Sequence, residues 1–160
     1  MNFGLNSSQN NFTSWFMEKL LLADDDMDDR LFFQDAVEEL SLSINLVTVC
    51  DGVELMELLL NNQEQLPDAL FLDLNMPRKS GYECLSEIKL SDTLKSIPVV
   101  IFSTSLDPEI VNKLYDNGAH YYIRKPGDFN VLKKVIYEAT VLLGQNSSDQ
   151  PDRVDFIIHS

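Results

Sequence analysis

The chain has 160 residues, 44% hydrophobic and 24% charged, which is the balance of a globular protein with one domain and its own core. Its formal net charge of −14 repels nucleic-acid phosphates and favours cations and basic partners. No apolar run reaches the roughly 18 residues that cross a bilayer, and no Lys or Arg precedes Lys19 as in a signal peptide. We therefore expect a cytoplasmic protein that binds neither nucleic acid nor membranes.

Two tails flank the predicted domain, which covers residues 17–144. Residues 1–16 are rich in Asn and Ser and are predicted to form a flexible N-terminal tail. Residues 145–160 are predicted to form a C-terminal tail that is polar at first and apolar from Val154 to Ile158. The sequence leaves open whether that apolar end packs on the domain or on a partner.

Apolar runs alternate with helical patterns between these tails. The runs predict strands at 19–23, 44–49, 69–72, 99–102 and 121–123. The spacing of apolar residues after each run predicts helices at 27–42, 51–61, 81–90, 108–117 and 128–143. Pro108 suits the first turn of its helix, and Gly118 suits the residue after the helix end. Because the runs are continuous rather than alternating, we expect an α/β fold with a parallel sheet covered by helices on both faces.

Polar residues directly follow four of the five predicted strands. Because parallel strands end at the same edge of a sheet, we expect these residues to gather around one pocket. They are Asp24, Asp25 and Asp26 after the first strand, Asp73 and Asn75 after the third, Ser103, Thr104 and Ser105 after the fourth, and Lys125 and Pro126 after the fifth.

The carboxylates of this set suit Mg²⁺, which prefers oxygen ligands and keeps several waters. Carboxylates that lie close together repel one another unless a cation lies between them. We predict Asp25 and Asp73 as direct ligands, together with the backbone carbonyl of Asn75, and Asp24 as a ligand through water.

Asp73 is the candidate acceptor of a phosphoryl group, because it borders both the metal and the lysine. A carboxylate takes a phosphoryl group as an acyl phosphate, and the transfer needs mainly positioning and charge neutralisation. Lys125 would pair with Asp73 and then with a phosphoryl oxygen. Ser103 would donate a hydrogen bond, and the amide of Thr104 a further one.

Each of these segments also has an ordinary structural interpretation. The acidic run 24–29 can be a solvated helix start, and Asp73 can be a cap or turn residue. Residues 103–105 can be a loop, and residues 125–126 a turn. Four independent placements at four strand ends would be a coincidence, so we favour a shared site.

Four segments carry a resemblance to a known family. They are KLLLADDD at 19–26, FLDLNMP at 71–77 followed by Gly81, PVVIFSTS at 98–105 and GAHYYIRKP at 118–126. In these segments the chain resembles the receiver domain of bacterial two-component response regulators, of the chemotaxis type. The resemblance implies a flavodoxin-like (βα)5 fold with strand order 2-1-3-4-5.

The resemblance also implies a set of roles around the acceptor. Asp73 would be phosphorylated by a sensor histidine kinase or a histidine phosphotransfer protein. Asp24, Asp25 and the carbonyl of Asn75 would hold Mg²⁺ beside it. Such a domain is a phosphoacceptor rather than an enzyme, although slow self-dephosphorylation is possible.

The implied output is a change of shape. Ser103 would bind the phosphoryl group, and the ring of Tyr122 would turn inward as that hydroxyl moves. Lys125 would pair with a phosphoryl oxygen, and its bond to Pro126 is typically cis in this family. The face made by 108–117, 121–123 and 128–143 would dock a downstream protein and allow a homodimer. Because no output domain follows Leu143, we expect a single-domain response regulator.

Three features depart from the family pattern. The switch hydroxyl is Ser103, where Thr is commoner, and three consecutive acids leave the register of the metal pair ambiguous. Gly127 and Asp128 follow Pro126 where an apolar residue is usual, so we expect a reshaped loop there.

Three other functions were compared with this interpretation. A haloacid-dehalogenase-type phosphatase needs a general acid two residues after its nucleophile, and Asn75 cannot donate that proton. A flavodoxin-type cofactor site needs hydroxyls or glycines after the first strand, where three Asp residues repel phosphate. A pseudo-receiver that binds partners without phosphorylation stays open.

The remaining reactive residues are expected to be structural. We expect Cys50 and Cys84 to be buried or half-buried free thiols. We expect His120 at the surface, His159 in the C-terminal tail, and Trp15 against the domain edge.

Overall fold

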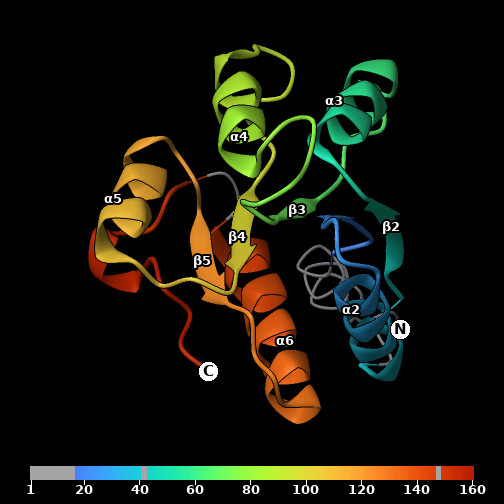
Figure 1. Ribbon diagram of the computed structural model, residues 1–160, viewed down its shortest axis with the longest axis vertical. Coiled ribbons are helices and arrows are strands. Elements are labelled where there is room, and N and C mark those ends of the chain that lie inside the picture. The colour runs from blue at the N-terminus through green and yellow to red at the C-terminus, as the bar shows by residue number, and fades with distance from the viewer. Residues whose placement is uncertain (1–16, 41–42, 147–148) are drawn as a thin grey trace, which may run out of the picture.

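A computed structural model of the chain describes residues 17–40, 43–146 and 149–160 (Figure 1). The expectations for residues 1–16, including Trp15, lie outside the described residues. The strands are β1 Lys19–Ala23, β2 Asn45–Val49, β3 Ala69–Leu72, β4 Val99–Ser103 and β5 Tyr121–Arg124. The helices are α2 Met27–Glu39, α3 Gly52–Asn61, α4 Gly81–Leu90, α5 Pro108–Asp116 and α6 Phe129–Asn146, with a short 3₁₀ turn, η1, at Arg153–Asp155.

The five strands form one parallel sheet in the order β2-β1-β3-β4-β5. This confirms the predicted fold and strand order. The prediction succeeded because β1, β3 and β4 are buried almost throughout, as continuous apolar runs on a two-sided sheet must be. β2 differs because it is an outer strand, and its side chains alternate in exposure.

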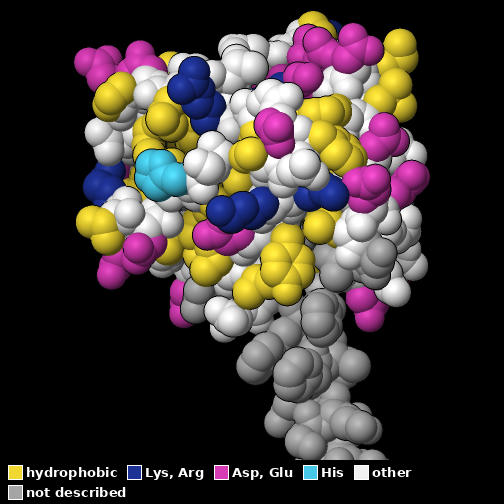
Figure 2. Space-filling model, turned by 90° about the horizontal axis from the view of Figure 1, so that it is seen from below, with side chains coloured by type: hydrophobic (Ala, Val, Ile, Leu, Met, Phe, Trp, Pro, Cys, Tyr) yellow, Lys and Arg dark blue, Asp and Glu magenta, His cyan; other side chains and the backbone are white. Residues whose placement is uncertain are grey.

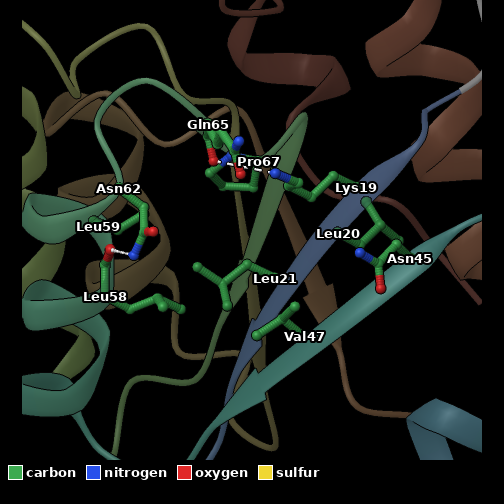
Figure 3. A pocket seen from close by; sticks show the side chains of 10 residues that line it. All are labelled: Lys19, Leu20, Leu21, Asn45, Val47, Leu58, Leu59, Asn62, Gln65 and Pro67. Atoms are coloured by element: carbon green, nitrogen blue, oxygen red, sulfur yellow. Dashed lines mark hydrogen bonds between the residues drawn. The ribbon is translucent and has the colours of Figure 1, made fainter.

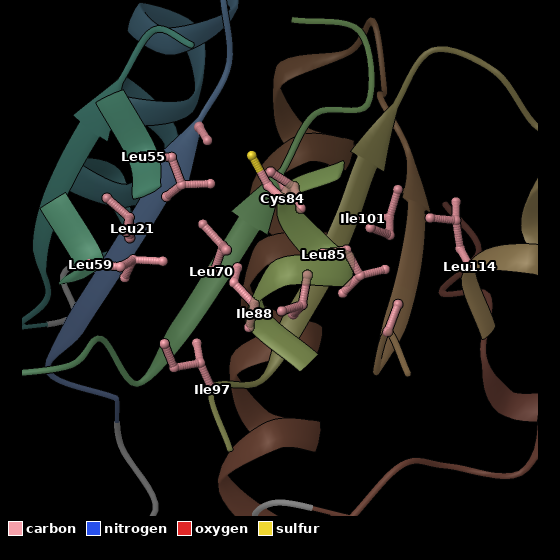
Figure 4. Packing of buried hydrophobic residues seen from close by; sticks show 14 of the residues in the cluster. Leu21, Leu55, Leu59, Leu70, Cys84, Leu85, Ile88, Ile97, Ile101 and Leu114 are labelled. Carbon is pink, nitrogen blue, oxygen red and sulfur yellow. The ribbon is translucent and has the colours of Figure 1, made fainter. Parts of the chain in front are cut away.

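Helices α3, α4 and α5 cover one face of the sheet (Figures 1 and 4). Leu21, Leu70 and Ile101 project from three neighbouring strands toward Leu85 of α4 and Leu55 of α3. All five side chains are at most 3% exposed, so this layer supplies much of the apolar burial that stabilises the fold.

Helices α2 and α6 cover the opposite face and contact each other (Figure 1). Phe33 of α2 packs edge-on against Phe71 and Phe102, with ring centroids 5.1 and 5.6 Å apart. Because successive residues of β1 alternate between the two layers, Leu20 and Leu22 belong to this second core. The two layers hold the central strands rigidly and fix the positions of their carboxyl ends.

Side-chain caps set where the helices begin. Asp26 accepts the amide of Asp29 at the start of α2, and Asp51 accepts the amide of Glu54 at the start of α3. Helix α5 begins at Pro108 as predicted. Its end at Asp116 leads to Gly118, whose φ of 94° confirms the expected left-handed position. The predicted end of the first helix at Leu42 lies outside the described residues, and α2 ends at Glu39.

Residues 150–158 pack on the domain along the outer edge of β5. Tyr122 donates its backbone N–H to the carbonyl of Phe156 and accepts the N–H of Ile158, each at 2.9 Å. Phe156 and Ile158 are 1% and 5% exposed. The apolar end of the tail, whose place the sequence left open, is therefore seated on the domain.

Two expectations about single residues were wrong. His120 is buried, not exposed, because its Nδ1 accepts the backbone N–H of Val99 at 3.2 Å, at the first residue of β4. Cys50 is exposed because it follows the outer strand β2, where its thiol donates to Glu54. Cys84 is buried as expected, and burial raises the pKa of its thiol to about 12.

Charged side chains of both signs lie on one face of the molecule. Figure 2 shows acidic side chains spread over the face that it displays, with Lys and Arg side chains among them. Within the described part of the chain, every helix is too short or too polar to cross a membrane.

Candidate functional site

Backbone hydrogen bonds fix the predicted site residues immediately after the strands. The N–H of Asp24 bonds to the carbonyl of Val49, and that of Asp73 bonds to the carbonyl of Ala23, at 3.1 and 2.9 Å. On the other side, the N–H of Lys125 bonds to the carbonyl of Ser103 at 2.8 Å. The sheet therefore brings the ends of β1, β3, β4 and β5 together at one edge, as predicted.

Three carboxylates meet there. Oxygen atoms of Asp24, Asp25 and Asp73 all lie within 4.8 Å of one another. Asp24 is fully buried and Asp73 is 5% exposed, whereas Asp25 is exposed. The buried Oδ2 of Asp24 lies 2.8 Å from the Lys125 ammonium, which is its partner. Closely spaced carboxylate oxygens, two of them from buried side chains, fit a small divalent cation of the Mg²⁺ type.

The ammonium of Lys125 lies among these acids. Its Nζ is 2.8 Å from Asp24, 2.9 Å from Asp29 and 3.6 Å from Asp73. It also lies 5.6 Å from the centre of the Phe102 ring, a cation–π contact. A 10%-exposed cation surrounded by three acids offsets part of their mutual repulsion.

The surroundings change the acidity of these groups. Burial raises the pKa of Asp73 to about 6, because its ionised form loses hydration, although the charge of Lys125 opposes this rise. Burial also raises the pKa of Asp24, against the hydrogen bond from Lys125. Burial lowers the pKa of Lys125, but its bonds to Asp24 and Asp29 outweigh that effect and leave the pKa above its ordinary value.

Ser103 and Tyr122 lie in neighbouring strands. Ser103 is fully buried, and its Oγ accepts the N–H of Ser105 at 3.3 Å. The Tyr122 hydroxyl donates to the carbonyl of Ser105, and its ring is fully buried. Burial raises the pKa of the Tyr122 phenol, while a hydrogen bond with Ser103 lowers it. The two residues that the resemblance assigned to the switch are thus in contact, and Thr104 beside them is exposed.

A close backbone approach shapes the segment after Asp73. A Cβ atom added to Gly81 would lie 2.0 Å from the carbonyl oxygen of Asp73, which no side chain tolerates. The N–H of Gly81 also bonds to the carbonyl of Leu74 at 2.9 Å. The glycine at this position therefore allows α4 to begin directly against the segment that carries Asp73.

Two features of the site differ from what the sequence indicated. Asp29 was not among the predicted site residues, but it accepts a hydrogen bond from Lys125 across 96 residues of sequence. Its place in the first turn of α2, three residues after the cap Asp26, was the only signal. The expected cis bond before Pro126 was wrong, since no described peptide bond is cis. Trans is the lower-energy isomer, and Gly127, with open space around it, lets the chain reach α6 from there.

A separate hollow of about 250 Å³ lies far from this chemistry (Figure 3). Lys19 and Asn45, which begin β1 and β2, line it together with Leu58, Leu59 and Pro67. It therefore opens at the amino ends of the strands, opposite the acidic cluster.

Comparisons with known proteins agree with this geometry. The family of response regulator receiver domains matches residues 20–137. The chain belongs to this family. As a receiver it is similar to the probable methanogenesis regulatory protein FilR2 of Methanothrix harundinacea, at 32% identity over 82% of this chain and 88% of FilR2. It is also similar to the response regulator Rcp1 of a Synechocystis species, at 31% identity over 73% of this chain and 82% of Rcp1.

Solved structures extend the likeness of the receiver to its fold. The phosphorylated cyanobacterial phytochrome response regulator RcpA has a TM-score of 0.71 and 34% identity, covering 84% of this chain and 99% of RcpA. The Mn(2+)-bound form of Rcp1 has a TM-score of 0.68 and 28% identity, covering 84% of this chain and 96% of Rcp1. The receiver is therefore a component of two-component signalling, and receivers of this family bind divalent cations at an acidic pocket.

Proposed function

We propose that this receiver accepts one phosphoryl group on a carboxylate oxygen of Asp73, in the presence of Mg²⁺, and signals through a change at its surface. The observation that carries the proposal is the position of the Lys125 ammonium, 2.8 Å from Asp24 and 3.6 Å from Asp73. From there it can pair with either carboxylate, and with an oxygen of a phosphoryl group attached to Asp73. An ordinary turn lysine would lie in solvent.

The transfer is a displacement at phosphorus. An oxygen of Asp73 attacks the phosphorus atom of a phosphohistidine, a P–O bond forms, and the P–N bond breaks with its electron pair leaving on the histidine nitrogen. Lys125 offsets the charge of the phosphoryl oxygens, and the Ser103 hydroxyl donates to one of them. Bound Mg²⁺ supplies further charge neutralisation and would be held by Asp24, Asp25, Asp73 and the carbonyl of Asn75.

The acidity of Asp73 suits the role of acceptor. Only the ionised carboxylate attacks phosphorus, and a pKa of about 6 leaves this group mostly ionised near pH 7. Because Lys125 keeps a raised pKa, it stays a cation across the same range. The pair therefore combines a nucleophile with a permanent positive charge, and catalysis by an added general base is unnecessary.

The partners follow from this chemistry. The donor is a sensor histidine kinase or a histidine phosphotransfer protein in the cytoplasm, and the net charge of −14 favours a basic docking surface on it. We assign the output to Ser103 and Tyr122, with Tyr122 inward in the phosphorylated state. A downstream protein, or a second copy of the chain, would be contacted through the face of α5, β5 and α6, where residues 150–158 cover the outer edge of β5 and form part of the surface.

Acetyl phosphate with MgCl₂ tests the proposal, with the intact mass of the protein as readout. We expect the wild type to gain one phosphoryl group, the gain to need Mg²⁺, and Asp73→Asn to abolish it. Asp28→Asn is a matched control, because it removes the same charge from an exposed position at the same end of the sheet. No gain in the wild type would favour a pseudo-receiver, and a gain in Asp73→Asn would move the acceptor elsewhere.

A further inference from the structure

The C-terminal segment, residues 150–158, covers the outer edge of β5 and pairs with it at a single isolated bridge. Ile157 forms a parallel bridge with Tyr122, whose backbone N–H and C=O both bond to the segment at 2.9 Å. In Figure 1 the segment runs past α5 and along β5. Phe156 joins the core under α5, and Ile158 joins the core under α6. The segment therefore closes the sheet between the two helices.

Polar contacts bind the same segment to α5. The side-chain amide of Gln150 donates to the carbonyls of Tyr115 and Ala119, both at 2.7 Å, and the Tyr115 hydroxyl donates to the carbonyl of Pro151 at 2.7 Å. The guanidinium of Arg153 bonds to Asp116 at 2.6 Å and lies 4.4 Å from the centre of the Tyr115 ring. Because hydrogen bonds are directional, these contacts fix the segment in one defined position, which apolar contacts alone would not do.

The segment seals the ring of Tyr122. Phe156 packs on this ring at a centroid distance of 6.2 Å, and the ring has no exposed surface. On its other side the hydroxyl group is bonded within the loop after β4, next to Ser103. Because Phe156 fills the space on this side of the ring, Tyr122 can turn outward past it only when the C-terminal segment moves away.

We propose that the C-terminal segment is a built-in ligand of the β5 edge, which holds Tyr122 inward and thereby favours the phosphoryl-bound state of the receiver. The inference rests on the proposed function, in which the inward ring belongs to the phosphorylated state. Segment and phosphoryl group then stabilise the same conformation, and each strengthens the binding of the other by the same factor. Without the segment, the receiver must first move Tyr122 inward, which weakens phosphoryl binding.

Beryllofluoride, a phosphoryl mimic, tests this coupling on the full chain with Mg²⁺ present. Binding is followed by the backbone amide signals of the site in NMR spectra. We expect Phe156→Ala to weaken beryllofluoride binding by about five- to twenty-fold, the usual range for coupled sites. Val154→Ala is the matched control, because Val154 lies in the same segment but is 87% exposed, and its affinity should equal that of the wild type.

A second measurement needs no substitution and covers the case in which Phe156→Ala fails to fold. The amide of Ile158 bonds to Tyr122, so its hydrogen exchange reports opening of the segment. Beryllofluoride should slow this exchange by the same factor by which Phe156→Ala weakens the binding of beryllofluoride. Unchanged or tighter binding in Phe156→Ala, or exchange that does not slow, would overturn the inference. Failure of the wild type to bind beryllofluoride would instead refute the proposed function.

Discussion

Replacing Asp73 with Asn should make the metal-free protein more stable at neutral pH. The substitution keeps the size of a side chain that is 5% exposed and removes its charge from the acidic cluster. Burial raises the pKa of this carboxyl from 3.8 to about 6, a rise of about two units. Since one unit corresponds to about 1.4 kcal/mol, the ionised group costs the fold at most about 3 kcal/mol. This figure already includes the opposing charge of Lys125, and we expect a gain of about 1–3 kcal/mol.

The sign of the pH dependence follows from the direction of the shift. Between pH 3.8 and about 6 the folded wild type binds more protons at Asp73 than the unfolded chain does. Its stability therefore falls as the pH rises through this window. Asp73→Asn lacks this contribution, so its advantage should be largest above pH 7 and vanish below about pH 4. Asp24, whose pKa is also raised, should leave a smaller slope of the same sign in the variant.

Urea unfolding in EDTA at several pH values measures this difference. Asp28→Asn, at an exposed position, should change the free energy of unfolding little at any pH. Added Mg²⁺ should make the wild type the more stable of the two proteins. It stabilises the wild type by binding its folded state, whereas Asp73→Asn lacks one of the ligands. The electrostatic account of the cluster is wrong if Asp73→Asn is no more stable than the wild type at pH 8. It is also wrong if the difference in the free energy of unfolding between the two proteins is the same at every pH.

Three further substitutions test separate contacts of the site. Lys125→Met should lower the free energy of unfolding by about 2–4 kcal/mol in urea, because the fully buried Asp24 loses its counter-charge. Gly81→Ala should destabilise by about 1–3 kcal/mol and slow the mass gain with acetyl phosphate, because its Cβ would lie 2.0 Å from the Asp73 carbonyl oxygen. A urea midpoint of Gly81→Ala equal to that of the wild type would argue against the close approach of Gly81 to the Asp73 carbonyl. Asp25→Asn, at an exposed position, should leave the metal-free melting temperature almost unchanged but abolish its rise with Mg²⁺.

The sequence predicted the sheet and the acidic cluster because both depend on local patterns. Continuous apolar runs have one stable place, between two helical layers, and polar residues directly after them must lie at the sheet edge. The topology alone then brings Asp73 and Lys125 together, although they are far apart in the chain. No knowledge of side-chain rotamers was needed for that step.

The features that escaped prediction depend on single long-range contacts. His120 is buried because one backbone N–H at the start of β4 needs an acceptor, and apolar periodicity carries no signal for that need. The contact between Asp29 and Lys125 joins residues that only the finished fold brings together. The position of residues 150–158 depends on their hydrogen bonds with Tyr115 and Tyr122. The sequence of a short polar tail with an apolar end does not indicate these partners.

A parallel sheet of five strands has two edge strands, and their unpaired backbone groups can pair with strands of other molecules. In this protein the β5 flank is closed at Tyr122 by the chain's own end, whereas β2 is the other outer strand. Loss of the last residues would uncover an aromatic, hydrogen-bonding edge, the type of surface from which aggregation starts. We therefore expect a variant without residues 150–160, which keeps all of α6, to scatter more light at high concentration than the full chain.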